Sequence, residues 1–432
     1  MSNSENKTQF TQHAFLVAWG WFGEHIGLPR RFQALHLKQK RYHHTPQSKV
    51  LEFLVSILGG LKHLQDISLA AHPLDKDRAV AEAWGQLEWA DYSGVSRTLA
   101  HLSWEEARQI VQILDEISQM YIDAELELLR LQSRRVRLDG DLTGIPVSNT
   151  SHTYPNATFG HMDNEIRLGY QAAVVSMESP SYGRLWLSGA HHPGDTVSCT
   201  QAEALVLAAE ARTGLRPLRR TDLLQKRIQA GELQMTETKK RRETQEQALQ
   251  QTKKRLAEAE QIHKERQVEL TGQEKAYQER QRKERPTSRL AQVRKRSQAA
   301  ARHLRSRQKE WQAAQKRLEK TVTRWKQQME NLESLYQRLK RFEQENATNS
   351  QPIEADFRLD AGFGIYENVA FLIEMGYDVY TKPHGNQALA FLKKQVNNQT
   401  AWKRVGANAE LIAWPNLQLK KCPYPLDVSR IT

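Results

Sequence analysis

Three aspartates have the residue type and spacing for metal-dependent phosphoryl transfer. Asp139 and Asp141 lie in residues 135–142 (RVRLDGDL), whose alternation of apolar and polar residues predicts a strand that ends in acids. Residues two apart on a strand point to the same face, so we expect these two carboxylates to lie together. Asp360 follows a second predicted strand, 355–359, and precedes small residues that allow a phosphate backbone to approach closely.

Cleavage or transfer of a phosphodiester benefits from two divalent ions about 3.5–4 Å apart. Mg²⁺ prefers carboxylate and water oxygens, so several acids must converge from different strands. A structural interpretation stays open for each aspartate. Asp139 and Asp141 can be turn-forming acids in Asp-Gly-Asp, and Asp360 can cap the segment that follows its strand.

The elements that must position these acids form two groups around a long polar segment. The alternation and helical periodicity predict further strands and helices at 167–177, 182–190, 201–213, 367–375 and 378–381. Without the polar segment the order is strand, strand, strand, helix, strand, helix, strand. This order predicts a mixed α/β layer with acids at the ends of its first and fourth strands.

The polar segment, residues 221–347, carries the whole positive excess of the chain. It holds 32 Lys and Arg against 18 Asp and Glu, whereas the 432-residue chain has a net charge of +13. Apolar residues recur there at seven-residue spacing. The first column is Ile228, Met235, Leu249, Leu256, Leu270 and Tyr277, interrupted by Arg242 and His263. The second arm has Leu304, Trp311, Leu318, Trp325, Leu332 and Leu339, with a partial second column at Val322, Met329 and Tyr336. A heptad repeat of this kind needs a partner helix. Because Pro286 breaks the helix, we predict an antiparallel coiled-coil hairpin whose arms of roughly 60 residues span ~90 Å.

The charge of this hairpin has two interpretations. It can be the solvated surface of a coiled coil, or a basic arm that lies against phosphates or a partner's helices. The candidate DNA-binding residues on it are Lys239, Lys240, Arg241, Arg242, Arg294, Lys295 and Arg296.

Residues 10–130 are predicted to be mostly helical. Phe15, Trp19 and Phe22 fall at i, i+4 and i+7 and mark the apolar face of a first helix, which we expect to pack in the core. Further helices are expected at 50–61 and 104–131. The pair His43-His44 precedes a helix start at Thr45-Pro46, but no third metal ligand lies near it in the sequence.

A short polar turn at 90–94 leads into a helix that carries Ser96, Arg97 and Thr98. This pattern resembles the second half of a helix-turn-helix, where small polar residues and Arg face the major groove of DNA. An ordinary capped helix explains the same residues equally well.

Other classes of protein fit the sequence poorly. The longest nearly uninterrupted apolar run, 50–61, is shorter than the ~20 residues of a membrane span, and residues 1–10 do not form a secretory signal. Cys199 and Cys422, far apart in the sequence, predict no disulfide scaffold. We therefore expect a cytoplasmic, nucleoid-associated protein without a membrane partner.

Two motifs resemble those of the DDE transposases of bacterial insertion sequences. Asp141-Leu142-Thr143 after a strand is similar to their first-acid motif, and Leu359-Asp360-Ala361-Gly362-Phe363 to their second. Between them, Asn149-Thr150-Ser151, Phe159-Gly160, 167–171 and 191–196 fit the middle of such a core. The resemblance covers about 134–213 and 353–432.

The resemblance implies an RNase H-like fold, DNA nicking and strand joining with Mg²⁺ (or Mn²⁺), and a homodimer assembled on transposon ends and target DNA. It implies Asp141 and Asp360 as catalytic metal ligands and Asp139 as a second choice. The family's third acid, a glutamate on a helix, has no match, since Glu410 lies in a strand-like stretch. We therefore expect that the last part of the core is missing and that the hairpin is an added insertion.

The expected fold is an α/β RNase H-like core with an N-terminal helical domain and an inserted coiled-coil hairpin. Its expected parts are a helical domain that is a candidate for DNA binding (1–130), the first part of the core (131–220), the hairpin (221–350), and the second part with the start of a β-rich insertion (351–432). Besides a transposase, two other hypotheses of function stay open. One is a non-catalytic coiled-coil protein with a degenerate core that binds nucleic acid or a partner. The other is a nuclease of the same RNase H-like type that cleaves without strand joining.

Overall fold

The structure is a computed structural model that describes residues 10–40, 43–149, 154–162, 165–383, 386–396, 401–419 and 422–431. The chain divides into two compact units. Unit 1 comprises residues 1–194 and 205–214, and unit 2 comprises residues 195–204 and 215–432. The part of the chain that is described contains no helix both long and apolar enough to cross a membrane.

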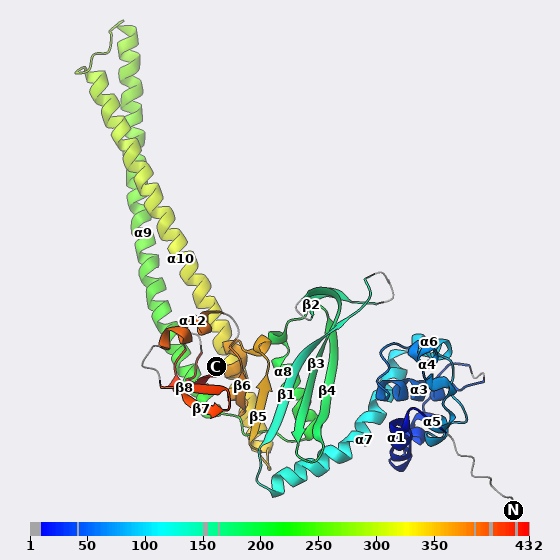
Figure 1. Ribbon diagram of the computed structural model, residues 1–432. Helices are drawn as coiled ribbons and strands as arrows, with labels where there is room; N and C mark the ends of the chain where they lie inside the picture. Colours follow the sequence, from blue (N-terminus) through cyan, green and yellow to red (C-terminus); the bar gives the residue numbers. More distant parts are fainter. Residues whose placement is uncertain are drawn as a thin grey trace, which may run out of the picture. The chain divides into compact units, whose positions relative to one another are not determined.

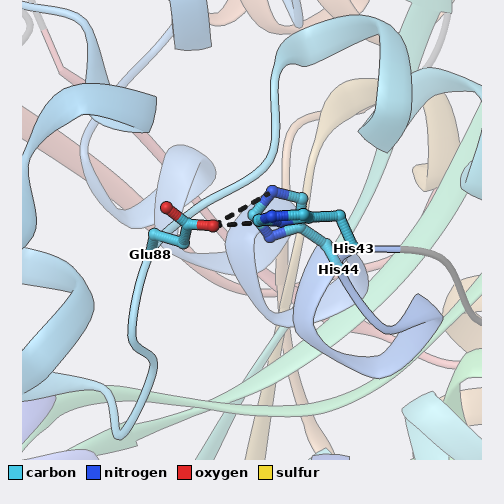
Figure 2. A group of neighbouring side chains, drawn as sticks. All are labelled: His43, His44 and Glu88. Carbon is cyan, nitrogen blue, oxygen red and sulfur yellow. Dashed lines mark ion pairs between the residues drawn. The ribbon is translucent and has the colours of Figure 1, made fainter.

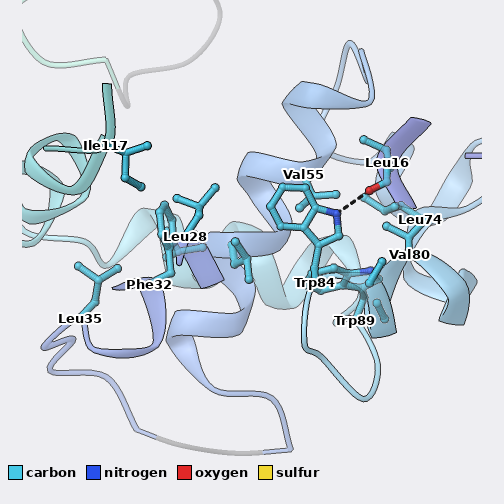
Figure 3. Close-up of a cluster of buried hydrophobic side chains, with 14 residues drawn as sticks. Leu16, Leu28, Phe32, Leu35, Val55, Leu74, Val80, Trp84, Trp89 and Ile117 are labelled. Atoms are coloured by element: carbon cyan, nitrogen blue, oxygen red, sulfur yellow. Dashed lines mark hydrogen bonds between the residues drawn. The ribbon is translucent and has the colours of Figure 1, made fainter. Parts of the chain in front are cut away.

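The first part of unit 1 is helical, as expected. Its elements are α1 (Ala14–His25), α2 (Leu28–Gln33), α3 (Pro46–Leu58), α4 (Asp66–Leu69), the 3₁₀ turn η1 (Leu74–Lys76), α5 (Arg78–Ala83), α6 (Tyr92–Ala100) and α7 (Trp104–Leu131). The predicted start of α3 is confirmed, because the Thr45 side chain accepts a hydrogen bond from the Ser48 amide and Pro46 takes the first helical position. Trp84 lies in the centre of the core and donates its ring N–H to the Leu16 carbonyl at 2.9 Å (Figure 3).

The aromatic face of α1 does not lie in this core. Phe15 is 84% exposed, Trp19 47% and Phe22 43%, so the expectation that they pack inside is wrong. The helix instead buries its glycine side. A Cβ on Gly20 would lie 2.7 Å from the Ala83 carbonyl oxygen, which means that α1 and α5 approach more closely than any side chain would allow.

The rest of unit 1 is an antiparallel sheet followed by most of α8 (Ala202–Thr213), whose first three residues belong to unit 2. Its strands are β1 (Val136–Pro146), β2 (Thr158–Met162), β3 (Glu165–Ser179) and β4 (Gly183–Pro193). β3 pairs with β1, β2 and β4. Three of these strands are predicted from the sequence, whereas β2 is not. β1 continues past Asp141 to Pro146, so Asp139 and Asp141 lie within the strand and not at its end as expected.

Unit 2 contains the predicted helical hairpin. Its arms are α9 (Thr221–Glu279) and α10 (Arg289–Thr348), which lie side by side along their length (Figure 1). The main seven-residue column of α10 faces α9, with Leu332 6% exposed. The second column differs from the expected one, since Met329 and Tyr336 are each 44% exposed. The residues of α10 that are buried instead lie three positions after those of the main column, and they include Thr321 and Phe342. Because much of this inner column is polar, apolar residues alone did not reveal it.

The remaining elements of unit 2 surround the hairpin base. They are the 3₁₀ turn η2 (Ser198–Thr200), β5 (Ala355–Leu359), the 3₁₀ turn η3 (Ala361–Phe363), α11 (Tyr366–Glu374), β6 (Asp378–Thr381), α12 (Asn386–Gln395), β7 (Lys403–Gly406), β8 (Ala409–Leu417) and β9 (Leu426–Ile431). β5 and β6 are parallel, and β7, β8 and β9 form an antiparallel sheet. The protein is therefore of mixed α/β class with a long helical pair. Glu410 lies on a strand, β8, as expected.

Candidate active site

Asp141 lies on the exposed face of β1. The strand alternates, with Val136 and Leu138 buried and Asp141 exposed. Thr143, two residues on and therefore on the same face, donates its hydroxyl to one Asp141 carboxylate oxygen at 3.0 Å, and the Leu142 amide donates to the other at 2.8 Å. These two local bonds fix the carboxylate, and they give a physical reason for Thr at the second position after this aspartate.

Asp139 shares this face but is already engaged. Its carboxylate lies 3.1 Å from the guanidinium of Arg184 on β4. A carboxylate paired with Arg is a weaker metal ligand, because the ion must displace the guanidinium charge. Arg184 had no sequence signal, since it comes from another strand of the sheet.

Asp360 directly follows β5 and is exposed. One carboxylate oxygen accepts the Gly362 amide at 2.9 Å, and the Asp360 carbonyl accepts the Thr381 hydroxyl at 2.8 Å. A Cβ on Gly362 would lie 2.5 Å from the Ser198 hydroxyl oxygen, so a larger residue there would displace the Ser198 side chain. Asp360 therefore caps η3, which is the structural role that the sequence also allows for it. It also presents its carboxylate at the carboxyl end of a strand.

Asp141 belongs to unit 1 and Asp360 to unit 2. The only two candidate acids that share a unit are Asp139 and Asp141. The convergence of Asp141 and Asp360, within about 6 Å if they share a pair of ions ~3.5–4 Å apart, stays a prediction. The quoted motif residues Thr150 and Ser151 lie outside the described residues.

The candidate basic residues of the hairpin differ in their surroundings. Lys239, Lys240 and Arg241 are exposed on α9, as are Lys295 and Arg296 on α10.

Two others are engaged within the hairpin. The guanidinium of Arg242 lies 4.7 Å from the ring centroid of Trp325 on α10, a cation–π contact between the arms. Arg294 forms ion pairs with Glu274 and Glu284. These two arginines hold the arms together, so the free charge comes from the other five.

The hairpin has a further concentration of positive charge that the sequence pattern does not indicate. Arg241, Arg317, Lys320 and Arg324 line one pocket of about 430 Å³ between α9 and α10, with Glu237 as the acid among its lining residues. The cations come from both arms, so their proximity depends on the register of the hairpin.

The polar helix near the N-terminus, α6, begins at an Asx cap. Asp91 accepts the Gly94 amide at 2.9 Å, and its pKa is lowered by the hydrogen bond from Ser93 and by this amide. Ser96 and Arg97 are exposed, whereas Thr98 is only 3% exposed. Two of the three candidate residues are therefore on the surface, and the Thr98 side chain belongs to the packing of unit 1.

Comparisons of the chain with protein-family models, with curated proteins and with solved structures found no match.

Proposed function

We propose that the chain is a DNA strand-transferring enzyme of the RNase H-like transposase type, dependent on Mg²⁺ or Mn²⁺, which assembles as a homodimer on the transposon ends and the target DNA. The observation that supports this most strongly is the pair of exposed aspartates on β-strand elements. Asp141 is oriented by Thr143 on the face of β1, and Asp360 lies at the end of β5 before a glycine. The order of strands and helices on either side of the hairpin agrees with this proposal.

The donor set fits a hard divalent cation. Asp141 and Asp360 offer exposed carboxylate oxygens, which Mg²⁺ prefers to nitrogen or sulfur. Bound ions would activate the attacking oxygen and stabilise the leaving oxygen of the phosphodiester. The chain's own contribution is to orient the two carboxylates. Thr143 and the Leu142 amide hold one, and the Gly362 amide holds the other.

The hairpin supports DNA as the partner. Arg241, Arg317, Lys320 and Arg324 place four positive charges around one pocket, and phosphate contacts of Lys and Arg supply most of the affinity of nonspecific DNA binding. In the sequence, this positive charge lies between the two candidate acids. The rest of the chain has a net charge near zero, so the hairpin would supply the surface that binds DNA.

The test asks whether the two aspartates share ions. Mn²⁺ binding to the full chain is measured by electron paramagnetic resonance, and nicking of duplex DNA is measured in Mg²⁺ and Mn²⁺. We expect Asp141→Asn and Asp360→Asn each to remove the same bound Mn²⁺. We expect each to lower nicking by more than the ~10–100-fold typical of changes outside the ligand shell. Asp123→Asn, on the exposed surface of α7, is the control and is expected to change neither.

A result in which one substitution removes the Mn²⁺ and the other leaves it bound would contradict a shared site. Since no third acid is assigned, strand joining by this chain is expected to be weak, and Mn²⁺ binding is the primary measurement. Nicking of generic DNA with no joined product would support the nuclease. DNA binding that needs no metal and disappears on deletion of 221–347, with no shared Mn²⁺ site, would support the non-catalytic coiled-coil protein.

A further inference from the structure

Three potential metal ligands meet in the helical part of unit 1, away from the candidate aspartates. They are His43, His44 and Glu88, shown in Figure 2. One Glu88 oxygen lies 3.0 Å from Nδ1 of His43 and 3.9 Å from Nε2 of His44. The three ligand atoms all lie within 4.8 Å of one another.

Two segments far apart in the sequence supply these side chains. The histidines stand directly before Thr45, the cap of α3, and Glu88 lies between α5 and α6. The sequence offered no third ligand near the histidine pair, and the fold provides one. Among the described residues this is the one group of three or more His, Cys, Asp or Glu that is compact enough to hold an ion.

A second observation points to a cation at this place. His44 and Glu88 line a pocket of about 410 Å³ together with Asp75. The Asp75 side chain is only 4% exposed, and its Oδ1 atom is buried with no hydrogen-bond partner in the described part of the chain. A buried carboxylate oxygen without a partner is costly, and a positive charge in the pocket would offset that cost. Lys76 is 3.8 Å from the other oxygen and 79% exposed, so its ammonium group is largely in solvent.

We propose that His43, His44 and Glu88 bind a divalent transition metal of the Zn²⁺ class, with the fourth coordination position open toward the pocket that Asp75 lines. Two imidazole nitrogens and one carboxylate oxygen suit Zn²⁺, whereas Mg²⁺ and Ca²⁺ prefer oxygen ligands alone. Zn–N distances of about 2.0–2.1 Å require the ligand atoms to close in. The His43 side chain is 81% exposed, and a small rotation would bring its ring nitrogen closer to an ion.

The ion would act as a structural clamp. It would fasten the segment before α3 to the segment before α6, the helix that presents Ser96 and Arg97. A metal that binds the folded chain raises the ratio of folded to unfolded molecules, by about 100-fold when free Zn²⁺ is 100 times its dissociation constant. This clamp is independent of the proposed DNA chemistry, which uses other residues.

The full chain, freed of metal by a chelator, is titrated with Zn²⁺ in competition with a chromogenic chelator, and thermal unfolding is followed with and without Zn²⁺. We expect the wild type to bind one Zn²⁺ that the double variant His43→Ala/His44→Ala and the single variant Glu88→Gln do not bind. The stabilisation by Zn²⁺ should disappear in the same variants. Glu88→Gln keeps the size of the side chain, so its unfolding without metal should match the wild type.

The matched control is the double variant His191→Ala/His192→Ala. It removes the adjacent histidine pair on β4, which the described part of the chain does not group with a third ligand. This control should retain the Zn²⁺, and so should Asp141→Asn and Asp360→Asn. The proposal is overturned if the wild type binds no such Zn²⁺, or if the His43/His44 and Glu88 variants bind as much as the control.

Discussion

Glu52 in unit 1 and Glu374 in unit 2 are both fully buried, but their carboxyl groups are satisfied in different ways. Glu374 ends α11 in unit 2 and is 0% exposed. It accepts hydrogen bonds from Arg227 on α9 at 2.5 Å, from Arg338 on α10 at 2.8 Å and from the Tyr424 hydroxyl at 2.8 Å. One carboxylate therefore ties together both arms of the hairpin and the chain before β9.

Glu52 in the middle of α3 is also 0% exposed. One of its oxygens accepts the Ala90 amide at 2.9 Å, and the other has no hydrogen-bond partner among the described residues. Burial raises the pKa of this carboxyl to about 8, against the opposing effect of the Ala90 amide.

The comparison shows what a buried carboxyl does when cations surround it and when they do not. Beside Arg227 and Arg338 the Glu374 carboxylate joins both arms of the hairpin through two ion pairs. No ion pair to Glu52 is seen among the described residues, and burial raises its pKa to about 8, so this carboxyl is protonated at neutral pH.

Replacement of Glu374 by alanine is expected to destabilise unit 2 the most. The change leaves Arg227 and Arg338 without their acceptor at a buried position, and breaking a buried ion pair typically costs about 3–5 kcal/mol. Urea unfolding of the full chain measures the loss.

The control is Glu333→Ala, which removes an exposed glutamate of α10 and should change the free energy of unfolding by less than about 0.5 kcal/mol. If the two variants unfold at the same urea concentration, Glu374 is not a junction.

Glu52 makes the stability of unit 1 depend on pH. Its pKa is about 8 in the folded chain and 4.5 ordinarily, so the folded state holds the proton more tightly. The stabilisation that the Glu52 proton gives to the folded state is complete below about pH 4.5. It is lost as pH rises from about 4.5 to about 8, and its size is on the order of a few kcal/mol.

The Glu52→Gln side chain has no proton to lose, so this variant should remove the slope of the free energy of unfolding against pH. Thermal unfolding of both chains at several pH values measures it, with Glu116→Gln as the exposed control. Identical slopes in the wild type and Glu52→Gln would show that Glu52 is not the titrating group.

The smallest effect is expected for Tyr424→Phe. This change removes one hydrogen bond to Glu374 and leaves both arginines in place, so a loss of about 1 kcal/mol is expected in urea unfolding. Burial and the neighbouring Glu374 raise the pKa of Tyr424, so its phenol should resist ionisation in an ultraviolet titration of the folded chain.

Tyr380, which is 58% exposed, provides the control through Tyr380→Phe. A loss for Tyr424→Phe as large as that for Glu374→Ala would mean that the hydroxyl, and not the pair of arginines, dominates the junction.

Much of the fold could be predicted because its signals are local. The bounds of β5, β6 and α7 are the predicted ones, and the helical hairpin is confirmed, since alternation, periodicity and proline act within a few residues. The packing of α1 was not predictable from its aromatics. Gly20 allows a backbone contact with Ala83 that outweighs the apolar stripe.

The candidate sites divide in the same way. Thr143 beside Asp141 could be predicted, because two residues on one strand share a face. Arg184 and Glu88 could not, because their partners are distant in the sequence and meet only in the fold. Thr98 shows the opposite error, in which a polar side chain near two exposed ones is buried.

The hairpin base also has a mechanical consequence. Arg219, which precedes α9, contacts Glu345 on α10 and the Met375 carbonyl after α11, so both arms start from a fixed block. Arms of 59 and 60 residues extend ~90 Å from it at ~1.5 Å per residue. A rotation of the base by about 5° would therefore carry the tip through about 8 Å, more than two base-pair steps of DNA. Glu374 and Arg219 lie at the end of the hairpin about which such a rotation would take place.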